Sequence, residues 1–123
     1  MSTIFIFLTM IFLHIIDDYC LQGWLASAKQ KEYWIKNAPE DMYKRDYIWA
    51  LIMHSFSWAF MIMLPIAYSK SFDVGVPFVI GILVNTFIHA IVDDLKANKK
   101  KINLWVDQIA HIAQIALTAV IFL

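Results

Sequence analysis

The chain has 123 residues, of which 61% are hydrophobic and only 16% are charged, whereas a soluble domain is about 45–50% apolar. A soluble domain of this size cannot bury so much apolar surface. The ten basic and ten acidic residues cancel, so the sequence lacks the basic surface that nucleic-acid binding requires. Cys20 is the only cysteine, which excludes an intramolecular disulfide and a thiolate zinc cluster. These properties predict an integral membrane protein.

Four apolar segments divide the sequence, each close to the length of about 20 residues that crosses a bilayer as a helix. They cover approximately residues 3–22, 46–67, 76–96 and 102–123. Between the first two, residues 24–36 are expected to form one short helix at the membrane interface. The sequence therefore predicts an all-α, polytopic membrane protein. Residues 1–123 would form a single transmembrane domain, with four spanning helices in a small bundle and one short interfacial helix in the first loop.

The basic residues are distributed asymmetrically among the loops. Nine of the ten lie in the first and third loops, and only Lys70 lies in the second. Because cytoplasmic loops carry an excess of Lys and Arg, we expect loops one and three to lie in the cytoplasm and both termini outside.

All four histidines fall within the apolar spans, about eight or nine residues from the end that we assign to the cytoplasm. Three of them have an aspartate four residues nearer that end, which places each pair on one helix face. These faces must point into the bundle, because lipid cannot satisfy polar groups. The resulting layer contains His14, Asp18, His54, His89, Asp93, Asp107 and His111.

Such a layer requires positive charge, since an aspartate at the centre of a span costs about 2.5–3.5 kcal/mol even on the lenient insertion scale. Protonated histidine, lysine or a metal ion could supply it, and His and Asp ligands without Cys favour a divalent ion, with zinc first and manganese or iron as alternatives. Seven ligands are too many for one tetrahedral zinc ion. Either some aspartates orient histidine rings, or two ions share the site. Lys29 and Lys96 are the loop lysines most expected to reach the layer.

The other polar residues of the spans are expected to have structural roles. Interhelical hydrogen bonds are expected from Asn85, Gln114, Thr118 and Ser57. Asn103 is expected on the helix face of Asp107, while Asp17 and Asp94 are expected at the interface or as supports for the layer.

The polar residues also form an ordered motif that covers nearly the whole chain. It reads His14-x3-Asp18-x3-Gln22, Ala26-x2-Lys29, His54, His89-x3-Asp93-x2-Lys96 and Asp107-Gln108-x2-His111. This motif resembles that of the bacterial and phage membrane-protein family catalogued as domain of unknown function 3307. The resemblance implies a bacterial inner-membrane location but no established activity. A more distant resemblance to inner-membrane proteins described as metal-dependent hydrolases implies a hydrolytic metal site without naming a substrate.

The leading hypothesis is therefore a membrane-embedded, metal-dependent hydrolase that acts on an ester or phosphoester from the cytoplasmic face. In this hypothesis Asp18 is a ligand or the general base, and Lys29 and Lys96 steer an anionic lipid headgroup or phosphate. One alternative is a metal-ion or proton path through the same layer. Another is a structural or partner-binding membrane protein with a buried polar network. A homo-oligomer is compatible with all three.

Overall fold

The computed structural model describes residues 2–123, which form helices joined by turns, with no strand in this range. Four of its helices are long and apolar enough to cross a membrane. For the first of them, this length includes the turn that directly follows the helix. They are α1 (Thr3–Ile16), α4 (Asp46–Ser69), α5 (Val76–Ala97) and α6 (Leu104–Phe122). The predicted all-α, four-helix membrane fold is confirmed.

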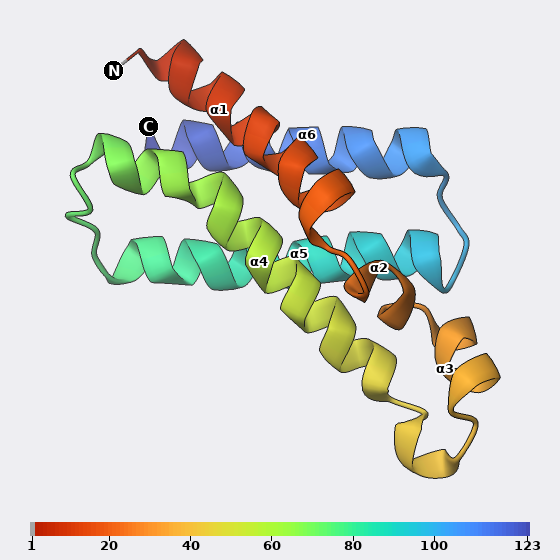
Figure 1. Ribbon diagram of the computed structural model, residues 1–123. Coiled ribbons are helices and arrows are strands. Elements are labelled where there is room, and N and C mark those ends of the chain that lie inside the picture. Colours follow the sequence, from red (N-terminus) through yellow and green to blue (C-terminus); the bar gives the residue numbers. More distant parts are fainter. Residues whose placement is uncertain (1) are drawn as a thin grey trace.

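The helices form a bundle in which α5 and α6 run side by side and α1 and α4 cross them obliquely (Figure 1). Both termini and the α4–α5 turn lie at one end of the bundle, and the first and third loops lie at the other. Contacts join these two loops: Lys100 Nζ donates to Glu32 Oε1 at 2.7 Å, and Lys31 N donates to Asn98 Oδ1 at 2.7 Å. The two basic loops therefore share one end of the bundle.

The end of α1 departs from regular α-helical geometry. The turn that continues it, Asp17–Leu21, is π-helical, and such a turn contains more residues than an α-turn and occurs frequently at functional sites. As a result, two consecutive side chains, Asp17 and Asp18, are both buried.

The first loop differs from the single interfacial helix that was expected over residues 24–36. It contains two short helices, α2 (Leu25–Ala28) and α3 (Lys31–Asn37). The chain turns between them at Lys29, whose side chain is directed into the bundle and is buried. A continuous amphipathic helix on the membrane surface would not allow this burial.

The start of α6 also differs from the prediction. The helix begins at Leu104, two residues later than expected, because the Asn103 side chain caps it by accepting a hydrogen bond of 3.0 Å from Val106 N. The expectation that Asn103 belongs to the buried face of Asp107 is therefore wrong.

The apolar core fills the half of the bundle nearer the termini. Trp58 and Ile62 of α4 are fully buried there, together with Met10 of α1 and Ile115 of α6. Of the four long helices, α4 is the most deeply buried. The polar layer lies between this apolar core and the basic loops.

Candidate metal centre

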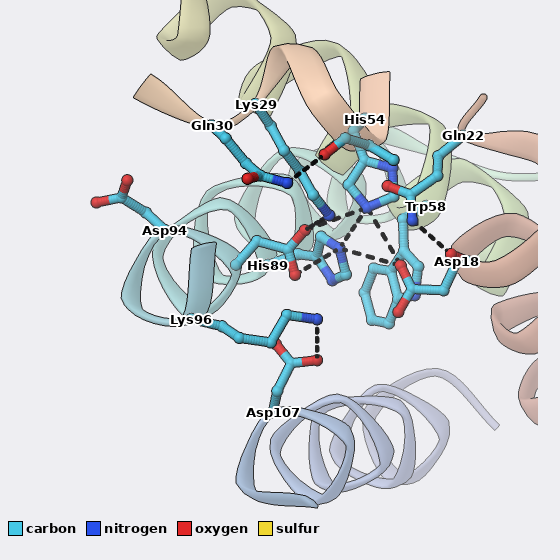
Figure 2. A network of polar contacts seen from close by, with 12 residues as sticks. Asp18, Gln22, Lys29, Gln30, His54, Trp58, His89, Asp94, Lys96 and Asp107 are labelled. Atoms are coloured by element: carbon cyan, nitrogen blue, oxygen red, sulfur yellow. Dashed lines mark hydrogen bonds and ion pairs between the residues drawn. The ribbon is translucent and has the colours of Figure 1, made fainter. Parts of the chain in front are cut away.

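Residues from all four long helices or their continuations form one buried polar cluster (Figure 2). Every member of the predicted His/Asp layer is at most 7% exposed. On α5 and α6 the i,i+4 spacing places each histidine next to its aspartate on one helix face. The helix α4 contributes His54. The predicted layer is thus one compact site.

The Nε2 atoms of three histidines converge within this cluster. His54 Nε2 lies 3.2 Å from His89 Nε2 and 3.2 Å from Asp18 Oδ1. On α6, His111 Nε2 lies 3.3 Å from Asp107 Oδ1. Each of these rings therefore directs the same nitrogen toward carboxylate oxygens.

Asp93 lies between the histidines and uses both of its oxygens. Its Oδ1 is 3.2 Å from His111 Nε2 and 3.6 Å from His89 Nε2. Its Oδ2 is 3.3 Å from His54 Nε2 and accepts a hydrogen bond of 2.8 Å from Lys29 Nζ. The carboxylate thus joins the two halves of the cluster.

Three overlapping groups in the cluster have ligand atoms close enough to hold a metal ion, all within 4.8 Å of one another. They are Asp18/His54/His89, His89/Asp93/His111 and Asp18/Asp107/His111. Around a tetrahedral zinc ion with bonds of about 2.0–2.1 Å, neighbouring ligand atoms lie about 3.3–3.4 Å apart. Several of the separations above fall close to this value.

Unpaired atoms within the cluster also fit a metal ion. The Oδ1 atoms of Asp18 and Asp107 are buried and have no hydrogen-bond partner, although each lies close to a histidine nitrogen. A buried carboxylate oxygen without a donor is costly, and coordination to a cation would remove that cost. The donor set of imidazole nitrogens and carboxylate oxygens suits a divalent ion such as zinc.

His14 differs from the other three histidines. Its Nδ1 accepts a hydrogen bond of 2.8 Å from Trp58 Nε1, and its Nε2 lies 3.0 Å from Gln108 Oε1. Because an indole N–H can only donate, Nδ1 carries no proton, and Nε2 donates to Gln108. Both ring nitrogens are therefore occupied, and His14 belongs to none of the three groups.

Gln108 extends this chain of hydrogen bonds to the carboxylates. Its Nε2 donates to Asp107 Oδ2 at 2.9 Å and to Asp18 Oδ2 at 3.3 Å. Trp58 also stacks on His89, with ring centroids 4.1 Å apart and planes 19° apart. Trp58 was not predicted as a site residue, although it lies four residues after His54 and so shares its helix face.

Asp17, which was expected either at the interface or as a support for the layer, takes the supporting position. Its side chain is buried, Ser57 Oγ donates to its Oδ1 at 2.7 Å, and its Oδ2 lies 4.0 Å from His54 Nδ1. Asp94, by contrast, stays at the edge, where Asn98 Nδ2 donates to its Oδ1 at 2.7 Å.

The two lysines that were expected to reach the layer both do so. Lys29 pairs with Asp93 as described, and its side chain is only 7% exposed. Lys96 Nζ lies 3.2 Å from Asp107 Oδ2, and its side chain is 30% exposed. Four buried aspartates (Asp17 and the three of the layer) thus face two lysines, which leaves two formal negative charges when the histidines are neutral. One divalent cation would balance them.

The amide and hydroxyl residues beyond the histidines join helices, as predicted. Gln114 Nε2 and Thr118 Oγ1 of α6 donate to Asn85 Oδ1 of α5 at 2.8 and 3.2 Å. The bond from Ser57 to Asp17 joins α4 to the π-helical turn that continues α1. These residues hold neighbouring helices together next to the His/Asp cluster.

Comparison with curated proteins and with solved structures gives no match. The family model described as "Protein of unknown function (DUF3307)" matches residues 6–123. The match includes every residue of the cluster and all but the first residues of α1. The chain therefore belongs to the DUF3307 family.

Proposed function

We propose that this protein is a membrane-embedded, metal-dependent hydrolase whose His/Asp cluster holds one divalent ion, zinc in the first place. The observation that carries the proposal is the convergence of three histidine Nε2 atoms on carboxylate oxygens, in a cluster whose four buried aspartates face only two lysines. A purely structural network would gain stability from neutral, fully paired groups instead.

The proposed ligands are His54, His89, His111 and the aspartates that face them. In such a site, a divalent ion supplies Lewis acidity and a nucleophilic water at neutral pH. The protein would keep the rings in place and exclude bulk solvent, since the cluster is buried. Trp58, His14 and Gln108 would hold His89 and the carboxylates in position through the stacking and hydrogen bonds described above.

Asp18 and Lys96 are the residues proposed to act on the substrate. Asp18 Oδ1 has no hydrogen-bond partner, so it can ligate the ion or accept a proton as general base. Lys96 is the more exposed of the two lysines of the cluster, and its ammonium group can bind an anionic ester or phosphoester, including that of a lipid headgroup. Lys29 is already paired with Asp93 and is assigned to the site rather than to the substrate.

The proposed location is the bacterial inner membrane, with the cluster in its cytoplasmic half. The first and third loops carry nine of the ten basic residues and share one end of the bundle. The positive-inside rule places such loops in the cytoplasm and therefore both termini outside.

The first test is elemental analysis of the detergent-purified protein. We expect about one equivalent of zinc, manganese or iron in the wild type and almost none in His89→Ala or Asp107→Ala. Asn85→Ala, which alters a buried polar residue of α5 outside the cluster, should retain the metal. A folded wild type that binds no divalent ion would overturn the proposal and favour a structural network.

The hydrolase activity requires a separate test. The metal-loaded wild type should cleave a chromogenic phosphodiester or a short-chain nitrophenyl ester, and chelation or His89→Ala should abolish cleavage. Lys96→Met should raise KM for the phosphodiester more than for the uncharged ester, since only the former carries a negative charge. Full activity in metal-free protein would contradict the proposal.

A further inference from the structure

Lys29 is the basic residue most deeply placed in the cluster. Its ammonium group lies 2.8 Å from Asp93 Oδ2, and this oxygen is also 3.3 Å from His54 Nε2. The ammonium therefore approaches the same carboxylate oxygen that a metal ion beside His54 would use.

The first loop is built to hold Lys29 in this place. The break between α2 and α3 lets the chain turn inward at this residue, and Asn98 of the third loop binds the backbone on both sides of the turn. Asn98 Nδ2 donates to Lys29 O at 3.0 Å, and Lys31 N donates to Asn98 Oδ1 at 2.7 Å. The position of the ammonium is thus fixed by both basic loops.

The cluster offers two cation positions that share Asp93. The first is formed by His89, His111 and Asp93, whose Oδ1 faces the Nε2 atoms of both histidines. The second lies around His54 Nε2, which has Asp18 Oδ1 at 3.2 Å and Asp93 Oδ2 at 3.3 Å; Asp18 and His54 form a candidate metal group together with His89. A carboxylate that uses one oxygen toward each of two positions is suited to a pair of ions.

Lys29 pairs with Asp93 Oδ2, the oxygen that faces the second position, and not with Oδ1, which faces the first. When the histidines are neutral and both lysines are present, one divalent ion neutralises the four buried aspartates. Without the charge of Lys29, the same ion would leave one buried negative charge beside an unpaired carboxylate oxygen, that of Asp18, and this arrangement attracts a further cation.

We infer that Lys29 fills the second cation position and thereby limits the centre to one divalent ion. This inference rests on the metal centre of the proposed function but not on its hydrolase activity. Lys29 is then a resident cation of the site, and the first loop determines how many ions the cluster accepts.

The experiment measures the number of ions per chain. The full-length protein is loaded with excess Zn²⁺ in detergent, desalted and analysed for zinc and protein, with circular dichroism as the check of folding. We expect one ion in the wild type and in Lys29→Arg, and two in Lys29→Met. Lys29→Gln, which keeps a hydrogen-bond donor for Asp93 without the charge, should also bind two and serves where the methionine variant does not fold.

Lys96→Met is the matched control, because it removes a lysine charge from another aspartate of the same cluster. Lys96 pairs with Asp107 and not with Asp93, so we expect one ion in this variant. One ion in both neutral Lys29 variants, or two in the wild type, would overturn the inference while leaving the metal centre intact. Absence of zinc from the folded wild type would instead remove the centre itself, and the inference with it.

Discussion

Trp58 donates a hydrogen bond of 2.8 Å from its indole nitrogen to His14 Nδ1, and this contact separates His14 from the other three histidines. The bond uses the lone pair that a metal would need on Nδ1 and leaves the proton on Nε2. His14 thus becomes a donor to Gln108, which in turn holds Asp18 and Asp107. Four histidines in one layer therefore divide into three candidate ligands and one positioning residue.

The first prediction follows from this division. His14→Gln should keep about one equivalent of metal but bind it roughly 10–100-fold more weakly, the usual effect of losing a group that orients a ligand. The measurement is a zinc titration in competition with a chromophoric chelator. His111→Gln, a matched change at a candidate ligand, should lose the metal at the same protein concentration.

The reverse ranking, with tight binding in His111→Gln and none in His14→Gln, would contradict the assignment of His14. Equal weakening in both variants would also contradict it, because the two residues are assigned different contacts with the ion.

Much of the cluster could be predicted because α-helical periodicity relates sequence spacing to helix faces. The i,i+4 pairs of α5 and α6 face inward as predicted, since the helices are regular there. Asp17 could not be placed by the same rule, because the π-helical turn changes the number of residues per turn at that point. The choice between α- and π-geometry depends on packing and hydrogen bonds such as that from Ser57 to Asp17.

The contribution of the first loop was predictable only in part. The reach of Lys29 and Lys96 followed from the long side chain of lysine beside a buried acidic layer. The turn that buries Lys29 depends on Asn98, which lies 69 residues further along the chain. Such a contact between distant loops leaves no periodic pattern in the sequence.

The second prediction uses Trp58 as a reporter of the metal. Because its ring stacks on His89 with centroids 4.1 Å apart, Co²⁺ bound to that histidine should quench Trp58 fluorescence. The measurement is a Co²⁺ titration of tryptophan emission. The saturable part of the quenching should disappear in Trp58→Phe and persist in Trp105→Phe, since Trp105 is an exposed residue of α6. Unchanged saturable quenching in Trp58→Phe would contradict a metal at His89.

The third prediction separates two neighbouring serines of α4. Ser57→Ala removes the donor to buried Asp17 and should destabilise the protein by about 1–3 kcal/mol, the cost of leaving such a group without its partner. Ser55 is also buried, but its Oγ has no hydrogen-bond partner. Ser55→Ala should therefore leave the free energy of unfolding almost unchanged.

Reversible unfolding in mixed detergent and SDS micelles measures both serine variants under the same conditions. The expected order places Ser57→Ala well below the wild type and Ser55→Ala beside it. An equal loss in the two variants would mean that the hydroxyl group contributes through packing rather than through its bond to Asp17.

The last prediction concerns the exchange of metal through the basic loops. Asn98→Ala removes the bonds to Lys29 O and Lys31 N, each of which contributes about 1 kcal/mol, together with the bond to Asp94 Oδ1. The turn at Lys29 should then open more often, and chelation by EDTA should remove the ion roughly tenfold faster with little change in ion content before chelation. Asn37→Ala is the control, because Asn37 Nδ2 donates only to Tyr33 O within its own helix. If Asn98→Ala and the wild type lose the ion at the same rate, the ion leaves by a route that does not pass beneath the first loop.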